Sequence, residues 1–261
     1  MTKNYLIYPT KTMNITQTHT MGNHYNHNAG SPKDYPFDEA CADSGRSWFY
    51  CPCDEMKIVK IYGVGVKGVN TIWLTSTSKV VMPCGTDYVT IMVEHPEDDD
   101  LGKLKVGQTF KRGIAMFREG GNGANGKGTY GNHFHISIGL GQIKGSGWAA
   151  NSKGSWVLTT TGALKKATDC FYLEDTQIRN SRSYTFKAVP KEEPKPVVKE
   201  DSKPATKEEP KDNTPDKYAK EAIEWAVKNG LLKGDEKGNY KLHSKITRQD
   251  MLVFLDRYNK L

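Results

Sequence analysis

Long hydrophobic runs are missing from this chain of 261 residues. No apolar stretch approaches the ~18 residues that a membrane-spanning helix needs, so we expect no membrane partner. The apolar cluster nearest the N-terminus, residues 5–8, is too short for the core of a signal peptide. We therefore expect the protein to be made in the cytoplasm. If it acts outside the cell, another agent must release it.

Dense basic blocks are missing as well. The formal net charge is +7, from 37 Lys and Arg against 30 Asp and Glu, and the excess is spread along the chain. Nucleic-acid binders gather basic residues on one face and often interleave them with aromatic side chains. We therefore expect no nucleic-acid partner, whereas a polyanionic surface such as a bacterial cell wall would attract a basic protein.

Cysteine is scarce, and its five residues are an odd number. Without a signal peptide, such a count indicates reduced thiols rather than a disulfide framework. Cys51 and Cys53 are separated by one residue, which is not the Cys-x-x-Cys spacing of a zinc ribbon or a redox site. We interpret the cysteines as buried structural residues. A metal site built from Cys41, Cys51 and Cys53 is the weaker alternative.

Residues 1–187 contain no sustained apolar stripe at helical spacing. Four segments rich in β-branched and aromatic residues predict strands instead. They are residues 55–64, 70–76, 87–95 and 133–139. Gly-, Asn- and Asp-rich segments separate them, so the sequence predicts a mainly β domain built on an antiparallel sheet.

The C-terminal quarter changes character twice. Residues 188–214 alternate charge with proline, which predicts a flexible, solvated linker. Residues 215–261 predict a small two-helix unit. Its first helix starts at Thr214 and Pro215 and ends at Asn229-Gly230, and a second helix follows Thr247.

Histidine is also rare, at seven residues, yet two stand close together in GTYGNHFHISIG, residues 128–139. Side chains alternate between the faces of a strand, so His133, His135 and Ser137 share one face. Phe134 and the two isoleucines share the other face, which we predict to be core. Paired imidazoles on a polar face suit metal binding or acid–base chemistry, although two solvated strand histidines are the simpler alternative.

Two other stretches could complete a catalytic zinc site, which needs about three protein ligands, an open position and a group that handles protons. One is residues 23–40. It contains His24, His27, Asp34 and Asp38. The other is His95, at the end of the apolar segment 87–95.

The order of these motifs resembles the M23 zinc metallopeptidases of the lysostaphin and LytM type. That family has a His and an Asp near the N-terminus, a lone His after a mid-domain strand, and a His-x-His strand. The resemblance covers about residues 14–140, and residues 104–120 are similar to the family's turn and strand. It implies a Zn²⁺ cofactor and hydrolysis of a peptide bond by zinc-activated water.

The resemblance also implies roles for individual residues. The zinc ligands would be His27, Asp38 and His135, and the residues facing the reacting carbonyl would be His95 and His133. Zinc brings the pKa of bound water to about 7, and an imidazolium can help to stabilise an oxyanion.

The first His and Asp stand further apart here than is usual in the family. We prefer Asp38 over Asp34 because apolar residues flank it like a strand entering a core. We prefer His27 over His24 only because it is nearer in sequence, and His19 ranks third.

A near P-loop occurs at residues 121–129, but Gly128 follows its lysine where Mg²⁺ coordination needs Ser or Thr. No helix pattern follows either. We interpret this stretch as a flexible loop beside the substrate groove.

The tail resembles a single S-layer-homology motif over about residues 216–258, which implies docking on cell-wall polymers. One such motif buries little apolar surface, so we also expect it to mediate homo-oligomerisation. A peptidase and a wall-binding motif joined without a signal peptide resemble a bacteriophage endolysin, an antimicrobial enzyme of cell-wall lysis. The alternatives are an N-acetylmuramoyl-L-alanine amidase and a non-catalytic cell-wall-binding protein. The complete set of candidate site residues argues against the last.

Overall fold

The computed structural model describes residues 3–40, 46–64, 68–179, 184, 186–190, 215, 219–233, 238–240, 242, 255 and 258. The chain divides into two compact units, Met1–Glu193 and Pro194–Leu261. Most of the predicted linker, most of the second predicted tail helix, Cys41 and His243 lie outside the described residues. Among the described helices, none is long and apolar enough to cross a membrane.

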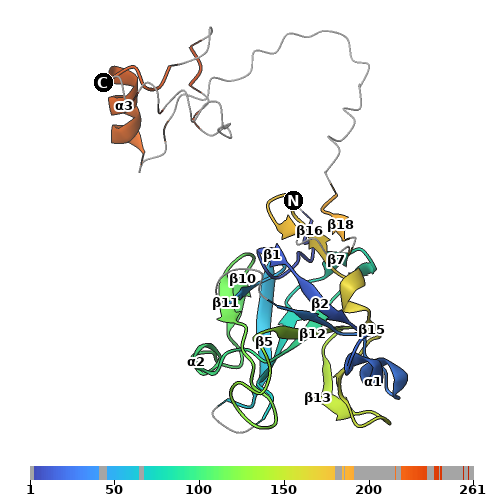
Figure 1. Ribbon diagram of the computed structural model, residues 1–261. Helices are drawn as coiled ribbons and strands as arrows, with labels where there is room; N and C mark the ends of the chain where they lie inside the picture. The colour runs from blue at the N-terminus through green and yellow to red at the C-terminus, as the bar shows by residue number, and fades with distance from the viewer. Residues whose placement is uncertain are drawn as a thin grey trace, which may run out of the picture. The chain divides into compact units, whose positions relative to one another are not determined.

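The first unit is built around one large antiparallel sheet, as the sequence predicts (Figure 1). Its strands are, in order, β10 (Thr109–Lys111), β5 (Glu55–Tyr62), β6 (Thr71–Ser76), β9 (Val89–Glu94), β12 (Phe134–Leu140), β3 (Phe37–Glu39) and β2 (Ile15–Thr18), with β15 (Leu164–Lys165) also paired to β12. All pairings in this sheet are antiparallel. The four predicted strand segments correspond to β5, β6, β9 and β12.

Short strand pairs form separate two-stranded sheets in the same unit. Three are antiparallel: β4 (Trp48–Tyr50) with β11 (Ala115–Arg118), β7 (Val80–Met82) with β8 (Gly85–Asp87), and β13 (Ile143–Ala150) with β14 (Trp156–Thr160). Two are parallel, β1 (Thr12–Met13) with β17 (Ile178–Arg179) and β16 (Tyr172–Leu173) with β18 (Lys187–Ala188). Parallel pairing was not expected from the sequence.

Short helices interrupt the first unit where the sequence predicts none. They are α1 (His24–Ala29), α2 (Asp98–Leu101) and the 3₁₀ turn η1 (Ala167–Asp169). A helix of one or two turns is too short to show a periodic apolar stripe, which explains the missed elements.

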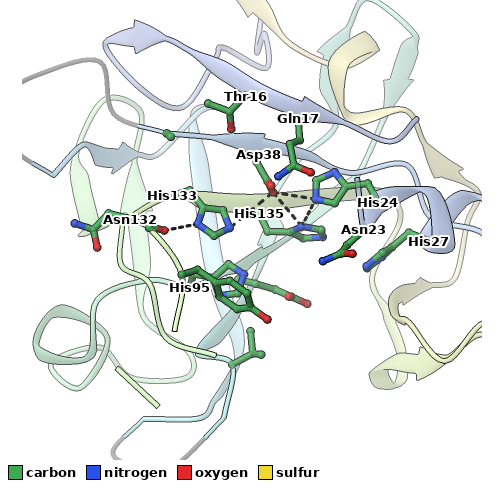
Figure 2. Close-up of a pocket in the computed structure, with 15 residues that line it drawn as sticks. Thr16, Gln17, Asn23, His24, His27, Asp38, His95, Asn132, His133 and His135 are labelled. Carbon is green, nitrogen blue, oxygen red and sulfur yellow. Dashed lines mark hydrogen bonds and ion pairs between the residues drawn. The ribbon is translucent and has the colours of Figure 1, made fainter. Parts of the chain in front are cut away.

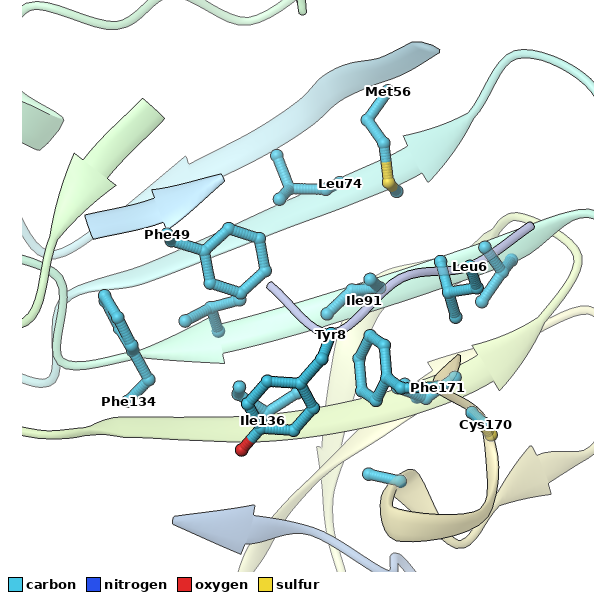
Figure 3. Packing of buried hydrophobic residues seen from close by; sticks show 14 of the residues in the cluster. Leu6, Tyr8, Phe49, Met56, Leu74, Ile91, Phe134, Ile136, Cys170 and Phe171 are labelled. Atoms are coloured by element: carbon cyan, nitrogen blue, oxygen red, sulfur yellow. The ribbon is translucent and has the colours of Figure 1, made fainter. Parts of the chain in front are cut away.

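One face of the sheet carries the hydrophobic core. Phe134, Ile136 and Ile138 of β12 are fully buried there, as their alternation predicts. The N-terminal segment crosses this face and packs Leu6 and Tyr8 against it (Figure 3). Cys51, Cys53 and Cys170 belong to the same core cluster, in agreement with the structural role predicted for them. The opposite face carries polar residues together with a smaller buried cluster of Trp73, Met92 and Leu158.

The second unit contains α3 (Lys220–Lys228), which lies within the first predicted tail helix. Asn229 caps its C-terminus, and Gly230 follows with φ +72°, a backbone conformation that glycine adopts without strain. The predicted end of this helix is therefore confirmed. Leu255 and Tyr258, in the predicted second helix, are also helical.

Candidate metal centre

Three ligand atoms converge on the polar face of the sheet. The Nε2 atom of His24, the Oδ1 atom of Asp38 and the Nδ1 atom of His135 lie 3.0–3.2 Å from one another (Figure 2). Ligands bound to zinc at 2.0–2.2 Å in a tetrahedron would be separated by about 3.4 Å. All three side chains are buried, and the triad has the mixed nitrogen and oxygen chemistry that zinc accepts.

Register explains two members of this triad. His135 on β12 pairs with Asp38 on β3, so both side chains project from the same face at the same level. Gln17 of β2 also pairs with Asp38, because a bulge between Ile15 and Gln17 shifts the strand and directs Gln17 toward the groove.

The third member comes from α1. The sequence-based ligand set contained His27, whereas the structure places His24 in the triad and His27 beside it. His24 begins the helix and is 4% exposed, and its ring centroid lies 4.6 Å from that of His135. The His27 ring lies 5.1 Å from His135. The two helix residues are three positions apart, so they share one face of α1 and compete for the same place.

Asp34, the alternative carboxylate, has a different task. Its Oδ1 accepts a hydrogen bond from the Tyr35 backbone N–H, and its Oδ2 accepts one from the Leu158 N–H. The carboxylate therefore joins the loop before β3 to β14 and lies outside the triad.

Electrostatics favour an ionised carboxylate among neutral imidazoles. Burial opposes ionisation of Asp38, but hydrogen bonds with His135 and His24 outweigh it and hold the pKa of this carboxyl far below its usual range. Burial lowers the pKa of His135 to about 3, and burial together with His24 lowers the pKa of His27 to about 4. A metal ligand must be an ionised carboxylate or a neutral imidazole. The Asp38 carboxylate and the His135 imidazole are therefore both in the form that binds a metal.

Buried imidazole nitrogens at this centre also lack partners. Nδ1 of His24, Nδ1 of His27 and Nε2 of His135 have no hydrogen-bond partner in the structure. A buried polar atom without a partner costs roughly 1–3 kcal/mol. The unpartnered nitrogens of His24 and His135 are not the two that converge with Asp38, so the converging Nε2, Oδ1 and Nδ1 atoms alone carry the case for a metal. The donor set therefore fits a metal ion such as zinc.

Two further histidines lie next to the triad. His95 follows β9 and His133 precedes β12, and their ring centroids are 4.4 Å apart. His95 has φ +67°, a left-handed conformation that is costly for a residue with a side chain and often occurs at functional sites. The structure thus brings together all five sequence-predicted site residues around one cavity of about 430 Å³, with His24 added.

Backbone carbonyls fix the orientation of these two rings. Nδ1 of His95 lies 2.6 Å from the Asn122 carbonyl oxygen, and Nδ1 of His133 lies 2.7 Å from that of Gly131. A carbonyl oxygen can only accept, so each Nδ1 carries a proton and each Nε2 is directed away from that carbonyl. Burial, followed by the nearby His133, lowers the pKa of His95 to about 4, which keeps it neutral.

Sequence reasoning missed Glu94, which also lines the cavity. It pairs with His135 across β9 and β12. Burial, followed by repulsion from Asp34 and Asp38, raises the pKa of Glu94 to about 8. Its position directly before His95, on the face shared with His135, is the signal that could have identified it.

Comparison with known proteins identifies the tail. Residues 211–252 match the S-layer homology domain family. A comparison with curated proteins gives no match.

Two solved structures are similar to the first part of the chain. A putative glycyl-glycine endopeptidase LytM from Ruminococcus gnavus has a TM-score of 0.35 and 16% identity, over 53% of this chain and 54% of that one. A zinc-containing peptidase from Vibrio cholerae has a TM-score of 0.32 and 19% identity, over 52% of this chain and 36% of that one. The chain thus covers about half of the first structure and about a third of the second.

Proposed function

We propose that this protein is a zinc-dependent endopeptidase that hydrolyses a peptide bond in bacterial peptidoglycan. The observation that carries the proposal is the convergence of His24, Asp38 and His135 in an open cavity beside two histidines whose rings are oriented by backbone carbonyls. The S-layer homology domain supports a cell-wall substrate, because this kind of domain implies contact with wall polymers.

The candidate site residues divide into metal ligands and residues that transfer protons. His24, Asp38 and His135 would hold the metal, which when bound would make hydroxide available near neutral pH and polarise the substrate carbonyl. The Nε2 atoms of His95 and His133, on the far side of each ring from its backbone carbonyl, would accept a proton from the attacking water and return it to the leaving amine. After protonation, the same rings can donate hydrogen bonds to a developing oxyanion.

A wall-digestion assay tests this proposal. Full-length protein with zinc should release soluble fragments from purified walls, and mass spectrometry should find a new amine and a new carboxyl group within the peptide. A cut between the sugar and the peptide would instead identify an N-acetylmuramoyl-L-alanine amidase. Lysis that continues after complete removal of metal would contradict the zinc mechanism.

Matched variants separate the two groups of histidines. His95→Asn and His133→Ala should keep the metal but lose about 10²-fold or more of the hydrolysis rate, because they remove proton transfer. Asn tolerates the left-handed backbone at position 95. Loss of metal in His133→Ala would place that residue among the ligands. The roles in phage-type lysis and in release from the cytoplasm stay predictions, which fractionation of producing cells would test.

A further inference from the structure

A row of paired side chains runs from the metal centre across the sheet. A bulge between Ile58 and Lys60 shifts β5 so that Tyr62 pairs with Thr71 of β6. Thr71 pairs with Glu94, and Glu94 pairs with His135. Neighbouring strands are about 4.8 Å apart, so Tyr62 lies roughly 14 Å from His135 on the same face of the sheet.

An aromatic cluster stands at the far end of this row. Trp148 of β13 is its centre. Its ring centroid lies 4.9 Å from that of Tyr62, 5.0 Å from Trp73 and 5.3 Å from Trp156. Trp73 is fully buried and forms the floor of this aromatic cluster. Its indole N–H donates a hydrogen bond to the Gly147 carbonyl.

Two rings of this cluster are open to solvent. Trp156 is 54% exposed and Tyr62 is 46% exposed, and both rings adjoin Trp148. Isolated exposed aromatics are ordinary, but adjoining ones form the kind of patch that marks a ligand site. Asn151, in the turn between β13 and β14, donates to the Asn26 carbonyl of α1, so this hairpin adjoins the helix that carries His24.

The Lys60 ammonium within this cluster already has interaction partners. The Lys60 ammonium lies 4.6 Å from the Trp73 centroid and 5.1 Å from that of Trp148, and it donates to the Ser146 carbonyl. This cation discourages a basic ligand. What the exposed surface offers is the faces and edges of aromatic rings, which suit a neutral ligand with a flat face of polarised C–H bonds.

We propose that Tyr62, Trp148 and Trp156 form an aromatic subsite for an N-acetylated sugar of the wall glycan. The proposal rests on the proposed function and deepens it. A pyranose ring presents axial C–H bonds to an aromatic face, whose quadrupole attracts them. In the wall, only a few peptide residues separate the sugar from the cross-links. An extended peptide of about four residues spans roughly 14 Å, which matches the distance from His135 to Tyr62.

A binding titration tests the subsite without catalysis. The N-acetylglucosamine tetramer, titrated calorimetrically into the full-length protein, should bind. Trp156→Ala and Tyr62→Ala should each weaken binding by about tenfold, and Trp156→Phe should restore part of it. Tyr88→Ala removes an exposed aromatic side chain at the opposite end of β9 and should change nothing. Circular dichroism would verify that each variant folds. Absence of binding to the unaltered protein would overturn the proposal.

A pair of substrates tests the position of the subsite. The same wall peptide is supplied with and without its attached disaccharide. Trp156→Ala should raise KM about tenfold for the sugar-bearing substrate only, with kcat unchanged. An equal rise for both substrates would assign the surface to peptide and overturn the sugar assignment. If the unaltered protein cleaved neither substrate, the proposed function would fail, while the titration would still decide the sugar subsite.

Discussion

At the scale of single residues, the two histidines of α1 offer the sharpest test of the metal centre. His24→Ala should reduce the bound metal well below one equivalent, because its Nε2 is one of the three converging atoms. His27→Ala should keep the metal, because its ring lies beside the triad. Elemental analysis of both variants after dialysis measures the difference. Retention of metal by His24→Ala together with its loss from His27→Ala would return His27 to the ligand set.

Buried neutral histidines also make the metal-free protein sensitive to acid. His95 has a pKa of about 4 in the folded chain, against an ordinary value of 6.5. Above pH 6.5 the ring is neutral in both states and adds nothing to the pH dependence. Between pH 6.5 and 4 only the unfolded chain takes up the proton, so stability falls by about 1.4 kcal/mol per pH unit for this group. Below pH 4 both states are protonated and the loss levels off.

Urea unfolding of the metal-free protein at several pH values measures this loss. His95→Asn should reduce the slope between pH 6.5 and 4 by about one proton, because Asn does not titrate. Tyr88→Ala, which removes an exposed side chain, serves as the control and should leave the slope unchanged. An unchanged slope in His95→Asn would contradict the burial of a neutral imidazole at this position.

At the scale of elements, the period-two pattern was the reliable signal. Alternation in β12 placed His133 and His135 opposite the core residues, and the structure agrees. The short helix α1 was not predictable, because six residues give no periodic stripe. The choice between His24 and His27 depends on that helix, which is why sequence spacing alone favoured the other histidine. The bulge in β5 was equally hidden, since it depends on pairing with β6.

The β13–β14 hairpin should stabilise the metal centre through one side chain. The amide of Asn151 donates to the Asn26 carbonyl, and its Oδ1 accepts from the Lys153 and Ser155 N–H groups. Asn151→Ala should therefore loosen α1, lower the melting temperature and weaken metal binding by about tenfold, as expected when a group that orients a ligand is removed.

Calorimetric titration of zinc and thermal unfolding measure both effects. Gln142→Ala, at the turn between β12 and β13, is the matched control and should leave both unchanged. Metal affinity that stays the same in Asn151→Ala, despite a lower melting temperature, would show that α1 holds its position without the hairpin.

At the scale of the whole molecule, composition indicated where one part of the chain gives way to the next, but it said less about the structure of each part. The S-layer homology match at residues 211–252 confirms the family resemblance of the tail. In that unit, α3 has no buried residue, and Trp225 on this helix is 49% exposed. An exposed Trp on an amphipathic helix is a surface that a wall polymer or a second copy of the chain could contact.

The tail should therefore concentrate the enzyme on its substrate without changing the chemistry. A chain ending at residue 193 keeps the whole first unit, with its own core and candidate metal centre, and should hydrolyse soluble wall peptides at nearly the full rate. It should pellet poorly with intact walls, because tethering raises the local concentration of a catalytic unit. Trp225→Ala in the full chain should reduce pelleting in the same direction, with the hydrolysis of soluble peptides as its internal control. Light scattering of the full and shortened chains tests self-association, and a monomer in both would contradict it. Equal pelleting of the two chains would place wall binding in the first unit, where the aromatic subsite would then be the first surface to test.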